Sequence, residues 1–182
     1  MSVVLRVALL LAVVLLAACG GGDERLEDAL PRSRDGLTVT SPDFRAGGPM
    51  PRRLSCAGAG DRPVLRWSGV PRRARELVLI VVDPDATGFV HWTVYGMRPS
   101  ARRLAATGLP PGAKEGKSSA GAIGWTPACP PQGDAPHHYE FTLYWLRRRT
   151  GLPEGVEPGE VVAALKGDVG GRGQLVGRFG RS

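Results

Sequence analysis

The stretch from Leu77 to Met97 constrains the fold of this chain more than any other. It opens with six apolar residues, 77–82, which are rich in β-branched side chains and too few to cross a membrane. Such a run is typical of a strand that is buried on both faces. Pro84 then lacks the N–H that a strand ladder needs, so we expect the strand to end just before it.

Two carboxylates and a histidine follow this strand. Asp83 and Asp85 flank Pro84, and His91 opens a second segment, 91–95, that alternates as a strand does. The end of one strand and the start of its antiparallel neighbour lie at the same edge of a sheet. The sequence therefore predicts that the three side chains meet at one rim.

The rest of the chain favours a single, mostly β domain over residues 37–182. Its length of 182 residues suits one domain. Short strands, separated by turns rich in glycine and proline, are expected at 37–40, 53–56, 64–67 and 137–146. One helix is expected from Pro158 to just before Gly167. This pattern is typical of two sheets that pack face to face.

The first residues indicate export. Residues 1–18 carry one cation, Arg6, followed by a run of Val, Leu and Ala, as in a secretory signal peptide. The residues before Cys19 resemble a bacterial lipobox, which predicts a mature chain that starts at a lipidated Cys19. An ordinary signal cleaved near Ala18 and an uncleaved anchor are the alternatives. Residues 19–36 are polar and are expected to form a flexible tether.

These features predict an exported lipoprotein. It would be held on the outer face of the cytoplasmic membrane, or in the periplasm or outer membrane, by its lipid anchor. Lipidation of Cys19 would leave Cys56 and Cys129 as an even pair in a compartment where disulfides persist. A disulfide is the leading hypothesis, and two separate buried thiols are the alternative. No further ligands stand nearby to favour a metal site at these cysteines.

The formal net charge of +7 comes from 24 basic and 17 acidic residues, and arginines cluster at 72–75, 102–103 and 147–149. Such clusters can mark a nucleic-acid surface. Export and the absence of a basic motif interleaved with aromatic residues argue against it, so no nucleic-acid partner is expected. A weak, salt-sensitive attraction to anionic lipid headgroups is expected instead.

All three histidines of the chain lie at the starts of expected strands: His91, His137 and His138. With Asp83, Asp85 and Tyr139 they would line a small polar pocket. The histidines and the tyrosine would donate to an anion, while the aspartates orient the imidazoles and raise their pKa. A phosphate monoester or a phospholipid headgroup suits such a pocket, with the aspartates facing an amine.

Three other interpretations of these residues remain open. Asp83, Asp85 and two histidines are also possible ligands of a divalent metal. Acid/base hydrolysis would use the same groups, but no Gly-x-Ser-x-Gly motif marks a nucleophile. In the third interpretation the residues have no functional role: the aspartates cap a turn, and the histidines are structural residues at strand ends.

Four motifs in order resemble the phosphatidylethanolamine-binding protein family, and specifically its bacterial Raf-kinase-inhibitor-like branch. They are Asp83-Pro84-Asp85-Ala86-Thr87, His91-Trp92, the segment Gly124-Trp125 to Cys129-Pro130-Pro131, and His137-x-Tyr139. The likeness spans residues 37 to about 179.

The resemblance implies a large central β-sheet packed on a smaller sheet, with one or two short peripheral helices and a small anion pocket. The residues carried over to that pocket are Asp83, Asp85, His91, His137 and Tyr139, with Pro130 and Pro131 as its wall. His138 stands where the family usually has arginine and is expected to face outward. The resemblance also supports a bridge between Cys56 and Cys129.

The family's described roles set the functional expectation. The resemblance implies a non-catalytic protein without a cofactor that binds a phospholipid headgroup or another small anion. Inhibition of an extracytoplasmic protease or signalling partner is the alternative, and such a protein partner is unknown. Two departures stand out: Thr126-Pro127-Ala128 replaces the usual Gly-Gly-Pro, and Thr87 replaces a usual proline. The missing glycine is expected to restrict backbone approach to a ligand, and Thr87 to loosen only the turn.

Overall fold

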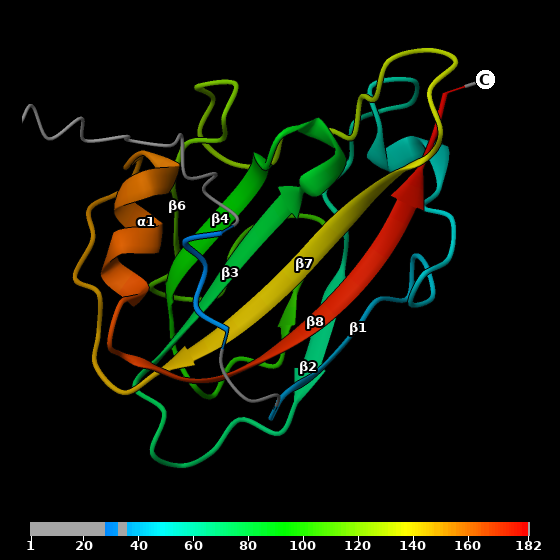
Figure 1. The fold of residues 1–182 in the computed structure, drawn as a ribbon. Helices are drawn as coiled ribbons and strands as arrows, with labels where there is room; N and C mark the ends of the chain where they lie inside the picture. Colours follow the sequence, from blue (N-terminus) through cyan, green and yellow to red (C-terminus); the bar gives the residue numbers. More distant parts are fainter. Residues whose placement is uncertain (1–27, 33–35, 182) are drawn as a thin grey trace, which may run out of the picture.

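The structure is a computed structural model that describes residues 28–32 and 36–181. The expected signal peptide, residues 1–18, and the expected lipidation site, Cys19, lie outside the described residues. Two antiparallel sheets and one α-helix form the described part of the chain (Figure 1). The expected fold, a large sheet packed on a smaller one with a peripheral helix, is confirmed.

The larger sheet has five strands in the order β6-β4-β3-β7-β8. Their bounds are β3 (Glu76–Asp83), β4 (Phe89–Met97), β6 (Lys114–Glu115), β7 (His137–Leu146) and β8 (Val169–Phe179). The smaller sheet has the order β1-β2-β5, with β1 (Thr38–Thr40), β2 (Leu65–Ser68) and β5 (Arg103–Leu104). The helices are η1 (Arg52–Leu54), η2 (Pro84–Ala86) and α1 (Pro158–Leu165).

Strand β3 lies in the middle of the larger sheet and is buried along its whole length. Its odd-numbered residues, such as Leu79, pack into the core between the two sheets. Its even-numbered residues, such as Ile80, pack on the other face of the sheet, where α1 covers them. The prediction of a strand buried on both faces is confirmed, and it explains why residues 77–82 are all apolar.

Helix α1 forms where the sequence predicted it. Pro158 occupies the first turn, where its missing N–H breaks no hydrogen bond. The carboxylate of Glu160 reaches back to accept from the backbone N–H of Glu157 at 2.9 Å. Val161, Val162 and Leu165 are buried in the cluster on this face of the larger sheet, and α1 lies beside that sheet in Figure 1. In the described part of the chain, no helix has the length and apolar character that crossing a membrane requires.

The expected strand at 53–56 is wrong, because residues 52–54 form the 3₁₀ helix η1. Ser55 closes this turn: both its backbone N–H and its hydroxyl donate to the carbonyl of Arg52, at 3.0 and 2.7 Å. Serine often competes in this way for backbone groups that would otherwise join a sheet.

Strand β8 was not predicted, because its sequence, Val-Gly-Gly-Arg-Gly-Gln-Leu-Val-Gly-Arg-Phe, is rich in glycine. The structure shows why glycine stands there. A Cβ atom at Gly173 would lie 2.3 Å from the backbone oxygen of Leu37, and one at Gly170 would lie 2.0 Å from the ring of Trp145. The backbone N–H groups of Gly36 and Leu37 both donate to the carbonyl of Arg172, so the chain before β1 covers this outer edge of the sheet.

Part of the segment expected to be a flexible tether contacts the domain. Ala29 and Leu30 pack against the core cluster that α1 covers. These apolar side chains therefore bring the described residues before β1 onto the larger sheet.

Replacing Gly173 with alanine tests the close approach at β8. The added methyl group would meet backbone atoms of Leu37 that cannot move aside, so we expect Gly173→Ala to lower the free energy of unfolding by about 1–3 kcal/mol. Gly159→Ala, in open space within α1, is the matched control and is expected to be neutral or stabilising by up to about 1 kcal/mol. Urea unfolding of both variants checks this, and equal effects would contradict it.

Candidate functional site

The site begins where β3 ends. Asp83 is the last residue of β3 and caps η2, where one of its carboxylate oxygens accepts from the N–H of Ala86 at 3.1 Å. Thr87 and Gly88 then take positive φ angles of 56° and 74°, which turn the chain back into β4. Phe89 consequently pairs with Asp83 across the two strands. The η2 turn thus holds a carboxylate at the rim of the sheet.

His137, the first residue of β7, brings the second strand to this carboxylate. Its Nδ1 lies 2.8 Å from Oδ2 of Asp83, and both side chains are buried. A carboxylate only accepts hydrogen bonds, so Nδ1 of His137 carries the hydrogen. The only ring nitrogen left for a ligand is therefore Nε2.

His91 approaches the same carboxylate from β4. Its Nδ1 lies 2.8 Å from the carbonyl oxygen of Thr126, which can only accept, so the hydrogen of the neutral ring is on Nδ1. Its Nε2 lies 3.9 Å from Oδ2 of Asp83. The ring also packs on Phe89, with 4.7 Å between ring centroids. The expected convergence of Asp83, His91 and His137 is thus present in the structure.

The pKa of His91 is lowered from its ordinary value, chiefly because burial disfavours the charged ring. The hydrogen bond to Thr126 and the charge of Asp83 act in the opposite direction but do not outweigh burial. Asp83 thus acts to raise the pKa of His91, as the sequence predicted, but burial outweighs it and the net direction is downward. Its ring is neutral at pH 7, with a bare nitrogen toward Asp83.

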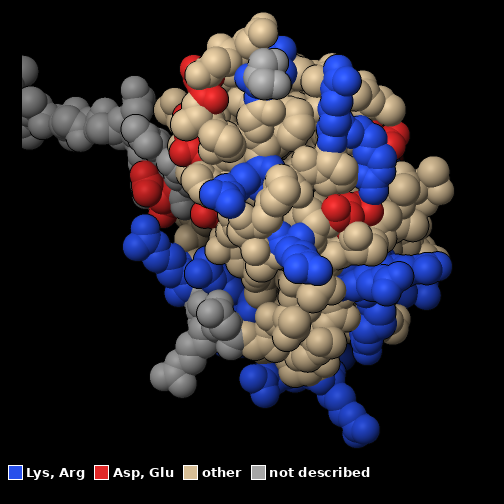
Figure 2. Space-filling model, turned by 90° about the vertical axis from the view of Figure 1, so that its right-hand side faces the viewer, with Lys and Arg blue, Asp and Glu red and all other residues tan. Residues whose placement is uncertain are grey.

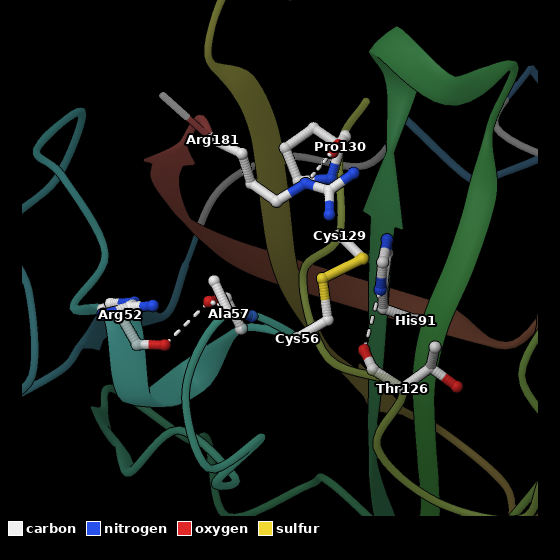
Figure 3. The surroundings of a disulfide bond; sticks show 9 residues. Arg52, Cys56, Ala57, His91, Thr126, Cys129, Pro130 and Arg181 are labelled. Carbon is white, nitrogen blue, oxygen red and sulfur yellow. Dashed lines mark hydrogen bonds between the residues drawn. A yellow bond between two sulfur atoms is a disulfide. The ribbon is translucent and has the colours of Figure 1, made fainter. Parts of the chain in front are cut away.

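These groups line a cavity of about 270 Å³ beside the disulfide-bonded segment. Its lining residues are Asp83, Ala86, Phe89, His91, Thr126, Pro127, Cys129, Pro130, Pro131 and His137. A disulfide joins Cys129 to Cys56, which confirms the expected pairing over two separate thiols (Figure 3). The bridge ties the proline wall of the cavity to the loop that follows η1.

Two of the expected pocket residues, Asp85 and Tyr139, are not among these lining residues. The carboxylate of Asp85 accepts instead from the backbone N–H of His138 at 2.6 Å and from its Nδ1 at 2.9 Å. Slight burial acts to raise the pKa of Asp85, but these hydrogen bonds and the charges of His138 and His137 outweigh it and lower that pKa. The exposed ring of His138 makes this residue the outward-facing histidine that the sequence predicted.

Tyr139 lies fully buried behind His91, with 5.0 Å between the two ring centroids. Burial, followed by the charge of Asp83, raises the pKa of its phenol well above the ordinary value. The hydroxyl is close enough to Asp83 for that side chain to contribute to the rise, although no hydrogen bond of ordinary geometry joins it to any residue of 28–32 or 36–181. Tyr139 therefore supports the ring of His91 and does not line the cavity.

Sequence reasoning missed four lining residues, Ala86, Phe89, Thr126 and Pro127, and one carboxylate near the cavity. Phe89 stands two positions before His91, so the period of a strand places both side chains on one face; that signal was available. Asp134 was also missed: its exposed carboxylate lies 3.9 Å from Nε2 of His137. No strand pattern marks Asp134, because it stands in the loop before β7.

The cavity offers few groups for other chemistry. Among the described residues, no group of three or more His, Cys, Asp or Glu side chains is arranged to hold a metal ion. The only hydroxyl among the lining side chains belongs to Thr126, and it donates to Ser118 at 2.7 Å. Cys129 is committed to the disulfide. The lining therefore presents no free thiol or unengaged hydroxyl as a nucleophile.

Comparison with known proteins places this site in context. Residues 40–180 match the model of a family described as phosphatidylethanolamine-binding protein. A Mycobacterium tuberculosis protein that carries the name lipoprotein LppC is 37% identical over 96% of this chain and 94% of its own length.

Two solved structures resemble the fold closely. One is the phosphatidylethanolamine-binding protein homologue CT736 from Chlamydia trachomatis, with a TM-score of 0.75 and 36% identity over 81% of this chain and 99% of its own. The other is YbcL of Escherichia coli, described as a member of the mammalian phosphatidylethanolamine-binding protein (PEBP) family. It has a TM-score of 0.75 and 28% identity over 81% of this chain and 99% of its own.

Removing the disulfide tests how firmly the wall of the cavity is held. The bridge closes a loop with a sequence separation of 73 residues, so we expect the double variant Cys56→Ala/Cys129→Ala to lose about 4 kcal/mol of unfolding free energy. Chemical denaturation of the oxidised protein and the double variant measures the difference. A change below about 0.5 kcal/mol would show that the wall is held by packing instead.

Proposed function

The chain belongs to the phosphatidylethanolamine-binding protein family, and from this premise we propose that it binds a small anion, a phosphate or a phospholipid headgroup, between Asp83, His91 and His137. One observation carries the proposal: two buried imidazoles line one cavity, and their Nδ1 atoms are held by Thr126 and Asp83, which leaves Nε2 of each ring for a ligand. Both rings are thus oriented before any ligand arrives.

Binding of the anion would be coupled to the uptake of protons by the protein. Because burial keeps the ring of His91 neutral, its Nε2 has no hydrogen to donate until an anion offsets the cost of a buried charge. On binding, each imidazole carries a proton on Nε2 and donates it to an anion oxygen. Asp83 then balances part of the imidazolium charge through its hydrogen bond with His137.

Asp134 would extend this recognition to an amine. Its exposed carboxylate lies on the side of Nε2 of His137, at 3.9 Å, where an amine attached to a bound phosphate would find a counter-ion. A headgroup such as phosphoethanolamine would thus satisfy the imidazoles with its phosphate and Asp134 with its amine. In this proposal Asp134 takes the amine-facing role that the sequence suggested for Asp83 and Asp85.

The proposed role is binding without turnover. Support comes from the lining of the cavity, where the one hydroxyl is engaged with Ser118 and the one cysteine is bridged to Cys56. Inhibition of a protease or signalling protein stays a prediction from the family resemblance.

We also propose that the protein is exported and anchored to a membrane through a lipidated Cys19. The relative LppC is named a lipoprotein, and its alignment covers 96% of this chain. An alignment over 96% of the chain includes most of the segment before residue 28, which contains the signal-like run and Cys19. The ligand would then be drawn from the surroundings of the membrane surface.

Titration with glycerophosphoethanolamine at two pH values tests this function. The phosphodiester keeps one negative charge throughout, so any pH effect comes from the protein. The lowered pKa of His91 means that binding takes up protons, and affinity should therefore rise by about tenfold between about pH 7.5 and about pH 5.5. Isothermal titration calorimetry of the mature protein measures both affinities.

Two histidine variants control the experiment. His91→Ala should abolish both the binding and its pH dependence, whereas His138→Ala, which removes an exposed histidine outside the cavity, should change neither. Affinity that is independent of pH, or equal losses in the two variants, would contradict the proposal. Release of ethanolamine by the wild-type protein that disappears in His137→Ala would show hydrolysis instead.

A further inference from the structure

A second and larger hollow, of about 900 Å³, lies where η1 and the end of β8 come together. It shares no lining residue with the cavity at Asp83, although the two are neighbours: Gln132 and Pro136 of the hollow adjoin Pro131 and His137 of the cavity in the chain. Hollows of this size commonly hold small organic ligands.

Three arginines line this hollow, and they come from separate parts of the fold. Arg52 belongs to η1, Arg178 to β8, and Arg181 follows the end of β8. No carboxylate is among the residues that line the hollow. Within the described ranges, none of the three guanidinium groups forms an ion pair, in contrast to Arg53, which pairs with Asp43 at 2.7 Å.

Hydrogen bonds hold two of these arginines in place, one through its backbone and the other through its side chain. The backbone of Arg178 is held on both sides, because its N–H donates to Gly48 at 2.9 Å and its carbonyl accepts from Met50 at 2.7 Å. Nε of Arg181 donates to the carbonyl oxygen of Pro130 at 2.6 Å, which orients the guanidinium and leaves its two outer nitrogens for a ligand (Figure 3).

The surroundings of the hollow add to its positive potential. Figure 2 presents the side of the molecule on which η1 and the end of β8 lie in Figure 1, and basic side chains clearly outnumber acidic ones on it. Because three arginines and no carboxylate line the hollow, its potential is positive, and a bound anion would offset that charge.

The chemistry of the lining selects the kind of anion. Guanidinium groups bind phosphate oxygens in pairs, and three of them suit a phosphoryl group with several charged oxygens better than a single carboxylate, which engages one guanidinium. Met50 and Phe179 also line the hollow and are almost fully buried, so they form an apolar base for it. The ligand therefore combines a phosphate with an apolar group.

From this arrangement we propose that the hollow between η1 and β8 is a second anion site, which binds an organic phosphate that carries an apolar group. The site is independent of the cavity at Asp83, since it uses guanidinium groups that stay charged at all physiological pH values and no histidine. Its affinity for a phosphate ester is accordingly set by charge and apolar contact, not by proton uptake.

Phenyl phosphate is a suitable soluble probe, because it joins a phosphate to an apolar ring. We expect the wild-type protein to bind it, and the double variant Arg52→Gln/Arg178→Gln to bind at least about tenfold more weakly. The control Arg66→Gln/Arg103→Gln removes the same charge from the exposed pair that faces across β2 and β5, and it should stay within about twofold of wild type.

Cross-tests separate the two sites. Arg52→Gln/Arg178→Gln should bind glycerophosphoethanolamine as the wild type does, and His91→Ala should still bind phenyl phosphate. No binding of phenyl phosphate by the wild type, equal losses in the two arginine double variants, or loss of phenyl phosphate binding in His91→Ala would each overturn the second site. If the double variant fails to fold, Arg52→Gln alone, whose side chain projects from an exposed position, replaces it.

A vesicle experiment identifies the source of the phosphate. Phosphatidylcholine vesicles with and without phosphatidic acid are sedimented with the wild type and with the two double variants. Binding that requires both phosphatidic acid and the arginines of the hollow assigns the site to lipid headgroups. Binding of phenyl phosphate without binding to vesicles assigns it to soluble organic phosphates.

Discussion

The site depends on one buried interaction, the hydrogen bond between Asp83 and His137. Burying a carboxylate whose side chain is only 3% exposed is costly unless its oxygens accept hydrogen bonds. Asp83 accepts two, from the backbone N–H of Ala86 in η2 and from Nδ1 of His137 in β7. The same hydrogen bond orients the imidazole of His137. One contact therefore both stabilises the buried carboxylate and positions a side chain of the cavity.

The sheets supply the position of that interaction. Strand β3 is apolar on both faces and therefore sits in the middle of the larger sheet, with α1 on one side and the smaller sheet on the other. Its antiparallel neighbours β4 and β7 bring His91 and His137 to the rim at which β3 ends. The disulfide at Cys129 then holds the proline segment against this rim, so the cavity is enclosed by segments far apart in the sequence.

The sequence predicted the parts of the structure that local pattern controls. The apolar run at 77–82 identified β3, the alternation at 137–146 identified β7, and the proline and glutamate at 158–160 identified α1. Strand β8 was not predicted, because glycine is untypical of strands. Its glycines are explained only by close tertiary contacts, such as that between Gly173 and the backbone of Leu37. Asp85 was assigned to the pocket because sequence spacing does not show that its carboxylate turns toward His138. The lowered pKa of His91 was missed for a similar reason, since burial and a nearby carboxylate oppose each other and only geometry decides between them.

The proposed binding mode requires that the two imidazoles are held by their Nδ1 atoms and keep Nε2 for a ligand in the cavity. Nitrogen NMR of protein labelled at histidine tests it most directly, because the shifts show which ring nitrogen carries a hydrogen. At neutral pH and without ligand, we expect a hydrogen on Nδ1 of His91 with a bare Nε2, and a hydrogen-bonded hydrogen on Nδ1 of His137 that loses this signature in Asp83→Ala, which removes the acceptor. A hydrogen on Nε2 of His91, or a His137 ring that does not respond to Asp83→Ala, would show that the rings are not held in this way.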